Sequence, residues 1–164
     1  MALFIGSTST RPKSSSGFIT DFSRKSEPEF AEYPALNGVK LPQGYVYLSN
    51  SEAHNFFGIK TDSSGEPRGE LEILQKDILI DDFTFDSERS VYLTTHPFNS
   101  LVKLSADGTR RRIAAGPNEA IFAGPTAAAF RRTETDRTAL YVVTDGGIIN
   151  HVGVRVGPGR IVRR

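Results

Sequence analysis

The stretch Val91-Tyr92-Leu93-Thr94-Thr95-His96 is the middle one of three similar apolar runs that decide how this chain folds. The other two are Tyr45-Val46-Tyr47-Leu48-Ser49-Asn50 and Leu140-Tyr141-Val142-Val143-Thr144-Asp145. Each run is rich in β-branched and aromatic residues, which are typical of strands. Tyr47, Tyr92 and Tyr141 hold equivalent places in the runs and lie 45 and then 49 positions apart. A period of this size indicates a repeat architecture.

Each run is flanked by further short apolar segments, joined to it by turn residues such as Pro42 and Gly44. The segments before the runs are 37–41, 81–85 and 126–130, and those after them are 56–60, 70–74, 100–104, 109–114 and 160–163. Four short antiparallel strands in about 40–50 residues form a β-propeller blade. A β-sandwich would explain the strands but not the repeated order of motifs. We therefore predict an all-β fold, a partial propeller of about two and a half to three four-stranded blades.

The repeat sets the expected domain organisation. We expect a polar, poorly ordered N-terminal segment at residues 1–32 and a partial propeller at 33–164, with blades at about 34–77, 78–118 and 119–164. Residues 1–16 are rich in Ser and Thr and contain no acidic residue. This composition fits a transit peptide as well as an unstructured tail, and we favour the tail. No signal peptide is evident, and no apolar run approaches the roughly 20 residues of a membrane span. We expect a cytoplasmic protein that does not enter a membrane.

The composition excludes several classes of function. The 164 residues include no cysteine, which removes disulfides, thiolate metal sites and cysteine nucleophiles. The net charge of +1 is unevenly spread, with −5 over residues 1–102 and +6 over residues 103–164. The arginines of the basic half are not interleaved with stacking aromatic residues, so we do not expect nucleic-acid binding. A hydrophobic content of 38% and a charged content of 24% are typical of a soluble globular protein.

Six polar residues are predicted to gather at one rim of the channel. Antiparallel pairing places the start of an inner strand beside the end of the next strand. The inner strands start at Asn37, Asp81 and Thr126, and the second strands end at Asn50, His96 and Asp145. Each of these residues also has a plain interpretation as a turn or cap. Together, the oxygen atoms of Asn37 and Asp81 suit a divalent metal (Ca²⁺, Mg²⁺, Mn²⁺ or Zn²⁺).

The order of motifs resembles the later blades of a six-bladed propeller family, the senescence-marker-protein/gluconolactonase/luciferin-regenerating-enzyme family, and its fungal members most closely. The resemblance rests on Asn37-Gly38-Val39, on 81–86 followed by 91–93, and on 124–127 followed by 140–147. It covers about residues 34–164 and corresponds to the C-terminal half. It implies a channel metal held by an early-blade glutamate, an asparagine matched by Asn37 and an aspartate matched by Asp81. The glutamate has no counterpart here, and Asp82-Phe83 stands where lactonase-like members usually have a glycine.

The resemblance implies hydrolysis of a lactone or a related ester, a small-molecule substrate. Asp81 would be the metal ligand or base and His96 a group that exchanges protons. Asn50, Thr126 and Asp145 would contact the substrate. One alternative is a metal-independent hetero-Diels–Alder cyclase of fungal specialised metabolism, with a pocket lined by phenylalanines (Phe56, Phe57, Phe83 and Phe85). Another is a non-catalytic propeller remnant. Half a propeller leaves open blade edges, so we expect either a fragment or self-association through those edges.

Overall fold

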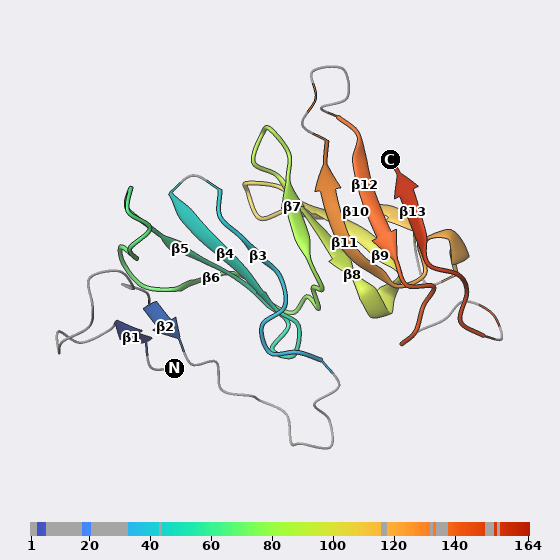
Figure 1. Ribbon diagram of the computed structural model, residues 1–164, viewed down its shortest axis with the longest axis horizontal. Helices are drawn as coiled ribbons and strands as arrows, with labels where there is room; N and C mark the ends of the chain where they lie inside the picture. The colour runs from blue at the N-terminus through green and yellow to red at the C-terminus, as the bar shows by residue number, and fades with distance from the viewer. Residues whose placement is uncertain are drawn as a thin grey trace.

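Three antiparallel sheets lie side by side in the computed structural model (Figure 1). The structure describes residues 33–42, 44–115, 118–131, 133, 138–149, 153 and 155–164, together with two short paired strands, β1 (Leu3–Ile5) and β2 (Phe18–Thr20). The rest of the predicted N-terminal tail lies outside the described residues. The three sheets confirm the prediction of an all-β, partial propeller fold.

Every sheet follows the chain in order, with each strand hydrogen-bonded to the next. The first blade contains β3 (Val39–Lys40), β4 (Tyr45–Asn50), β5 (Asn55–Lys60) and β6 (Glu72–Gln75). The second contains β7 (Phe83–Phe85), β8 (Val91–Thr95), β9 (Ser100–Leu104) and β10 (Arg110–Ala115). The third contains β11 (Pro125–Phe130), β12 (Leu140–Thr144) and β13 (Arg160–Arg163). Two 3₁₀ turns, η2 (His96–Phe98) and η3 (Ala120–Phe122), connect strands.

The three tyrosine runs are the second strand of each blade, as the repeat predicted. Tyr47 lies opposite Lys40, Tyr92 opposite Thr84, and Tyr141 opposite Ala129. In each case the partner belongs to the inner strand. The alanine-rich segment before the third run forms strand β11, although its composition would also suit a helix. Its place in the repeat therefore identified it better than its propensity did.

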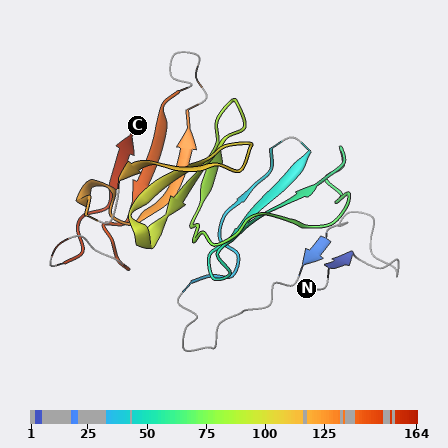
Figure 2. The ribbon, with the colours of Figure 1, turned by 180° about the vertical axis from the view of Figure 1, so that it is seen from behind.

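Two hydrophobic clusters hold the blades together, one in each seam between neighbouring sheets. The first seam is centred on Phe56 of β5 and Phe83 of β7, both almost fully buried. The second seam is centred on Leu101 of β9 and Val142 of β12, whose exposed fraction is 0%. The view from behind shows β7–β10 as the middle sheet, with a blade on either side (Figure 2). The core thus lies between the sheets, as stacking of blades requires.

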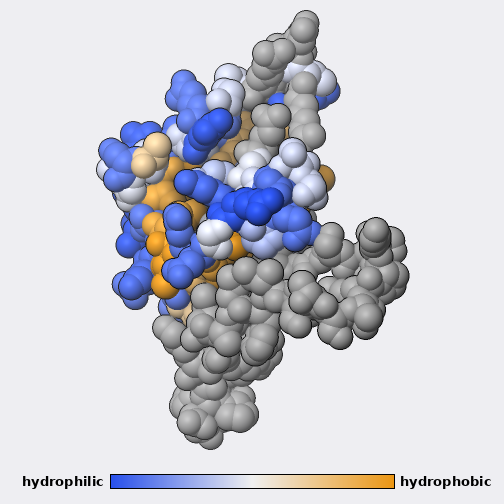
Figure 3. All heavy atoms as spheres, turned by 90° about the vertical axis from the view of Figure 1, so that its left-hand side faces the viewer, coloured by the Kyte–Doolittle hydropathy of each residue, from blue (hydrophilic) through white to orange (hydrophobic). Residues whose placement is uncertain are grey.

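Apolar side chains also reach the surface on the side of the first blade. Leu41, Ile73 and Leu74 all count among the exposed large hydrophobic residues. Figure 3, which looks onto that side, shows hydrophobic surface among hydrophilic side chains. Within the part of the chain that the structure describes, no helix is long and apolar enough to cross a membrane.

Candidate functional site

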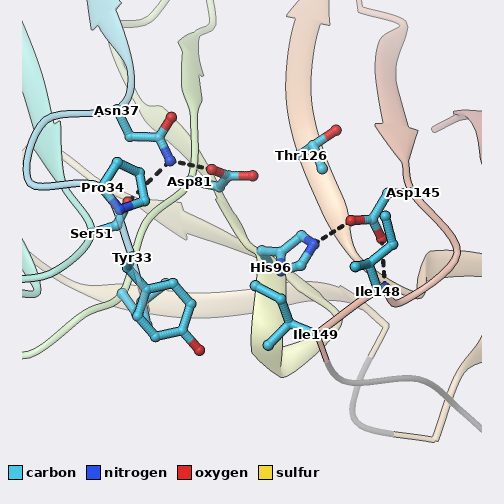
Figure 4. A pocket seen from close by; sticks show the side chains of 11 residues that line it. Tyr33, Pro34, Asn37, Ser51, Asp81, His96, Thr126, Asp145, Ile148 and Ile149 are labelled. Carbon is cyan, nitrogen blue, oxygen red and sulfur yellow. Dashed lines mark hydrogen bonds and ion pairs between the residues drawn. The ribbon is translucent and has the colours of Figure 1, made fainter. Parts of the chain in front are cut away.

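A cavity of about 340 Å³ lies at one end of the three blades (Figure 4). Five of the six polar residues predicted from the repeat line it, namely Asn37, Asp81, His96, Thr126 and Asp145. The remaining lining residues are Tyr33, Pro34, Ser51, Leu79, Ile148 and Ile149. The cavity therefore combines a small number of polar groups with an apolar wall, which is typical of a site for a small molecule.

Backbone pairing explains why these residues meet. The Asn37 N–H donates to the Ser49 carbonyl over 3.1 Å, and the Asp81 N–H donates to the Thr94 carbonyl over 2.8 Å. In the third blade the Asp145 N–H donates to the Gly124 carbonyl over 2.9 Å. Each contact joins the start of an inner strand to the end of its neighbour, as the antiparallel arrangement predicted. Residues up to 108 positions apart, from Asn37 to Asp145, thus line one cavity.

At the rim of the first seam, an amide holds a carboxylate. The Asn37 Nδ2 group donates to the Asp81 carboxylate and to Ser51 Oγ, the latter over 3.1 Å. Ser51 Oγ in turn donates to the Ile80 carbonyl over 2.6 Å. These bonds run from the first blade to the segment just before β7. They fix the position of Asp81 without supplying a positive charge.

Gly38, beside Asn37, leaves room for this contact between blades. A Cβ atom there would lie 2.7 Å from Asp82 Oδ1 and 3.0 Å from Ser49 Oγ. The Gly38 N–H donates to Ser49 Oγ over 2.7 Å, and Ser49 Oγ donates to the Asp81 carbonyl over 3.1 Å. A side chain at position 38 would have to displace the side chains of Asp82 and Ser49, so glycine preserves the contacts between the two blades.

At the rim of the second seam, an imidazole holds the other carboxylate. His96 Nε2 lies 2.6 Å from Asp145 Oδ2. Asp145 Oδ1 accepts the backbone N–H groups of Gly147 over 2.7 Å and Ile148 over 3.2 Å. The His96 side chain is buried, and no described residue bonds its Nδ1 atom. His96 lines the cavity, and its Nε2 atom bonds Asp145, another lining residue.

The two carboxyl groups have pKa values shifted in opposite directions. Burial raises the pKa of Asp81, and the nearby charges of Asp82 and Asp145 add to this, against the opposing effects of Asn37 and His96. Burial alone would also raise the pKa of Asp145, but the hydrogen bonds from His96 and from two backbone N–H groups lower it. Asp145 is thus held in its ionised form, whereas Asp81 takes up a proton more readily than an ordinary aspartate.

Asn50 is the one predicted site residue that the structure places elsewhere. Its exposed fraction is 1%, and its Oδ1 accepts the Ala53 N–H over 2.8 Å in the turn after β4. The next residue, Ser51, lines the cavity instead. Asn50 is the last residue of β4, as the sequence predicted, but its side chain bonds the backbone of the turn that follows, and the cavity is reached only by Ser51 in that turn.

The other residues singled out from the sequence have clear places. Thr126 lines the cavity, and its hydroxyl donates weakly to the Val143 carbonyl over 3.4 Å. Asp82, which stands where a glycine was expected, pairs with Lys40 Nζ at 2.8 Å. The four phenylalanines of the cyclase alternative do not line this cavity, and Phe56 and Phe83 belong to the core of the first seam.

Two apolar elements of the wall were missed in the sequence. Tyr33 and Pro34 lie just before the first blade, and Ile148 and Ile149 follow β12. None of them occupies a repeated position, so the period gave no signal for them. One sequence signal for Ile148 and Ile149 does exist, namely the glycine pair after Asp145, which indicates a turn. In the structure Gly146 and Gly147 have left-handed φ values of 86° and 83°, and this turn carries the chain past Asp145.

The side chains of Asn37 and Asp81 do not by themselves form a metal site. Asn37 and Asp81 lie together, but the amide N–H of Asn37 faces the carboxylate. Among the described residues, no group of three or more His, Cys, Asp or Glu side chains could hold an ion. Calcium takes six to eight oxygen ligands, and magnesium demands six. The residues present therefore do not fit a resident divalent metal without further ligands.

The comparisons with known proteins show the fold. No family model and no curated protein matches the sequence. A luciferin-regenerating enzyme is similar in structure, with a TM-score of 0.60, 17% identity, 78% of this chain covered and 44% of that one. Regucalcin from Agrobacterium tumefaciens, described as a calcium-binding protein, has a TM-score of 0.52 and 19% identity over 66% of this chain and 37% of its own. A streptogramin B lyase has a TM-score of 0.52 and 16% identity over 79% of this chain and 40% of its own.

These likenesses confirm the propeller fold that the sequence resemblance implied. At identities below 20% they support the fold and not a shared activity. The chain spans less than half the length of each of these three proteins. The closer likeness to fungal members, and the number of blades in a closed ring, stay predictions.

Proposed function

We propose that the cavity at the blade ends hydrolyses a lactone or a related ester, with Asp81 as the group that transfers the proton. The observation that carries this proposal is the pair of carboxyl groups, Asp81 and Asp145, whose surroundings shift their pKa values apart within one cavity. Two carboxyl groups whose pKa values are shifted apart by their surroundings are a common basis for acid–base catalysis.

Asp81 would act first as a base and then as an acid. In its ionised form it accepts a proton from a water molecule as the water oxygen attacks the ester carbonyl carbon. The tetrahedral intermediate then loses its ring oxygen, and the protonated Asp81 returns the proton to that oxygen as the C–O bond breaks. The products are a carboxylic acid and an alcohol, joined in one molecule when the substrate is a lactone. A raised pKa makes Asp81 a stronger base than an ordinary carboxylate.

The other polar side chains would orient the reactants. Asn37 fixes the Asp81 carboxylate, because its amide nitrogen bonds both Asp81 and Ser51. The weakly bonded Thr126 hydroxyl can turn toward the carbonyl oxygen of the ester. Asp145, held by His96, can accept hydrogen bonds from substrate hydroxyl groups. The apolar wall formed by Leu79 and Ile148 would limit access of water.

The family resemblance also implies a divalent cation, and the likeness to regucalcin, a calcium-binding protein, is a reason to test for one. Asn37 and Asp81 are too few ligands to hold a cation, so the proposed reaction uses the side chains alone. Treatment with EDTA separates the two possibilities. A rate that survives EDTA supports the acid–base mechanism, whereas a rate that is lost and then restored by Ca²⁺ or Mn²⁺ contradicts it.

The test is the hydrolysis of aldonolactones such as glucono-δ-lactone, followed by acid release. Asp81→Asn should lower kcat/KM by roughly 10²–10⁴-fold, the usual contribution of general acid–base catalysis. Asp107→Asn is the matched control, because Asp107 lies in an exposed turn of the second blade, outside the cavity, where its side chain accepts the Thr109 N–H. The proposal is wrong if Asp81→Asn retains full activity in folded protein.

The pH profile gives a separate readout. Asp81 must be ionised to act as the base, and its pKa is raised. The rate should therefore rise as the pH increases through the raised pKa of Asp81, and this limb should lie above the usual range of an aspartate. In Asp81→Asn the remaining activity should lose this limb.

A further inference from the structure

A second hollow region lies at the opposite end of the first seam, outside the site described above. It consists of two cavities of about 310 and 260 Å³, which share Tyr47, Phe85 and Arg89 as lining residues. Pro42, Tyr45 and Asp86 complete the smaller cavity. We call these six residues the hairpin groove, because they come from the hairpins β3–β4 and β7–β8. None of them lines the cavity of Asp81.

The walls of the hairpin groove are aromatic. The rings of Tyr45 and Tyr47 stack with their centroids 5.4 Å apart, and Tyr47 and Phe85 lie at 4.8 Å. All three side chains are half-buried, so part of each ring remains open to solvent. The Tyr47 ring also stacks on Phe56 at 5.8 Å, so the partly open rings offer a planar ligand apolar contact and edge-to-face geometry.

Arg89 supplies a positive charge at the same place. The side chain is exposed, and within the described part of the chain no hydrogen bond or ion pair involves its guanidinium. Its charge acts on the neighbouring phenol: burial and Tyr45 raise the pKa of Tyr47, and Arg89 opposes this rise. A guanidinium beside an aromatic wall is suited to bind a carboxylate through two parallel hydrogen bonds.

The one carboxylate of the groove does not cancel this charge. Asp86 accepts the N–H groups of Glu88 over 2.9 Å and Ser90 over 2.8 Å. Its other oxygen lies 3.2 Å from the Tyr92 hydroxyl and 3.4 Å from Lys103 Nζ. Burial opposes ionisation of Asp86, but these hydrogen bonds lower its pKa. Asp86 is thus compensated by Lys103, and Arg89 remains free for a ligand.

The backbone at Arg89 supplies an independent observation. Arg89 has a φ of 66°, in the left-handed region that side chains other than Gly and Asn rarely adopt. The corresponding hairpin of the first blade has Gly44 in this region, with a φ of 78°. This conformation is strained for a residue with a long side chain. It fixes the point at which the Arg89 side chain leaves the hairpin, beside Tyr47 and Phe85.

We propose that the hairpin groove binds a planar aromatic carboxylate, with its ring against Tyr47 and Phe85 and its carboxylate paired with Arg89. The aromatic walls select a flat apolar body, and the single uncompensated guanidinium selects one negative charge. The groove is separate from the Asp81 cavity, so this inference does not depend on the proposed hydrolase activity.

The test uses 2-naphthoate as the probe and NMR of the full, ¹⁵N-labelled chain as the readout. Saturable shifts are expected at the backbone amides of residues 45–47 and 85–90, and not at those of Asp81 and Asp145. The uncharged analogue 2-naphthamide should bind about tenfold more weakly or worse, since a hydrogen bond to a charged group contributes about 1.5–3 kcal/mol.

The decisive variant is Arg89→Asn, because asparagine tolerates the left-handed backbone and keeps the hairpin folded. It should lower the affinity for 2-naphthoate about tenfold or more and leave the weak binding of 2-naphthamide unchanged. Arg68→Asn is the matched control, since Arg68 is exposed and pairs with Asp62 in another turn. Equal affinities of wild type and Arg89→Asn for 2-naphthoate, or shifts confined to the Asp81 cavity, would overturn the proposal.

Discussion

The two seams of this molecule are built to the same plan and have opposite electrostatic effects. In each seam one side chain at the cavity rim reaches across to a carboxylate of the next blade. The first seam uses the amide of Asn37 to hold Asp81, and the second uses the imidazole of His96 to hold Asp145. An amide supplies hydrogen bonds without charge, whereas an imidazole can also carry one. Burial raises the pKa of Asp81 despite the hydrogen bond from Asn37, whereas at Asp145 the hydrogen bonds from His96 and from two backbone N–H groups outweigh burial and lower the pKa.

The interiors of the seams differ as well. The first is packed with aromatic rings, among them Phe56 and Phe83 at a centroid distance of 4.8 Å. The second contains mainly aliphatic side chains such as Leu101 and Ala128, with one buried ring, Phe122, and with Tyr92 and Phe130 at its margin. The repeat therefore places a contact between blades at the same position in both seams, but different residues form it and pack beneath it in each seam.

The largest expected effect comes from emptying the aromatic seam. Phe83 is fully buried, and Phe83→Ala should lower the free energy of unfolding by about 3–5 kcal/mol in urea titrations. Phe98→Ala serves as the control, because Phe98 is 55% exposed and should change stability by no more than about 0.5 kcal/mol. Similar losses for the two variants would contradict the packing described for the first seam.

A smaller effect is expected within the third blade, where Gly124 lies against Asp145 at the rim of the second seam. A Cβ atom on Gly124 would overlap Asp145 Oδ1, and the φ of Gly124 is 64°. Gly124→Ala should therefore destabilise the fold by about 1–3 kcal/mol and displace Asp145. Gly65→Ala is matched for backbone conformation, with a φ of 87° and no atom near its Cβ. If both variants lose the same stability in thermal or urea unfolding, the close approach of Gly124 to Asp145 does not add to the destabilisation, and the expectation is wrong.

Much of this arrangement follows from the sequence, and particular residues show where prediction ends. The period of the tyrosine runs identified all three blades, because alternating apolar residues specify strands and their order. Antiparallel pairing within each blade, together with the propeller arrangement of the blades, correctly predicted that Asp81, His96 and Asp145 lie at one rim. Asn50 was expected at the rim, but its buried side chain accepts the Ala53 N–H in the turn after β4, and the repeat gives no signal for a local hydrogen bond of this kind. The split between the carboxyl pKa values depends on burial and on contacts across blades, which the period does not encode.

The charge of the second seam can be tested through the pH dependence of stability. The folded pKa of Asp145 is lowered, so its stabilising contribution is present above the unfolded pKa of about 3.9 and is lost as the pH falls through the folded value. His96→Asn should reduce this loss on acidification, because it removes the hydrogen bond that contributes most to lowering the pKa of Asp145. An unchanged acid limb in urea titrations between about pH 2 and 5, the range in which an aspartate with a lowered folded pKa gains its proton, would contradict the role of His96.

The smallest effect is expected for the ion pair beside the first seam. Lys40 Nζ and Asp82 are 2.8 Å apart, with side chains 36% and 17% exposed. Such pairs contribute about 0–1 kcal/mol, so Lys40→Met should change the free energy of unfolding by no more than about 1 kcal/mol. The difference from wild type should shrink in high salt. A loss as large as that of Phe83→Ala would show that the ion pair, and not the aromatic core, holds the first seam.

The measurement that tests the central claim most directly is a ¹³C NMR titration of the Asp81 and Asp145 carboxyl groups in the same sample. Our account predicts that Asp81 titrates above the usual aspartate range and Asp145 below it. The assignments follow from Asp81→Asn and Asp145→Asn, each of which removes one titrating signal. Two carboxyl groups that titrate together, or in the reverse order, would contradict the account and with it the proposed role of Asp81.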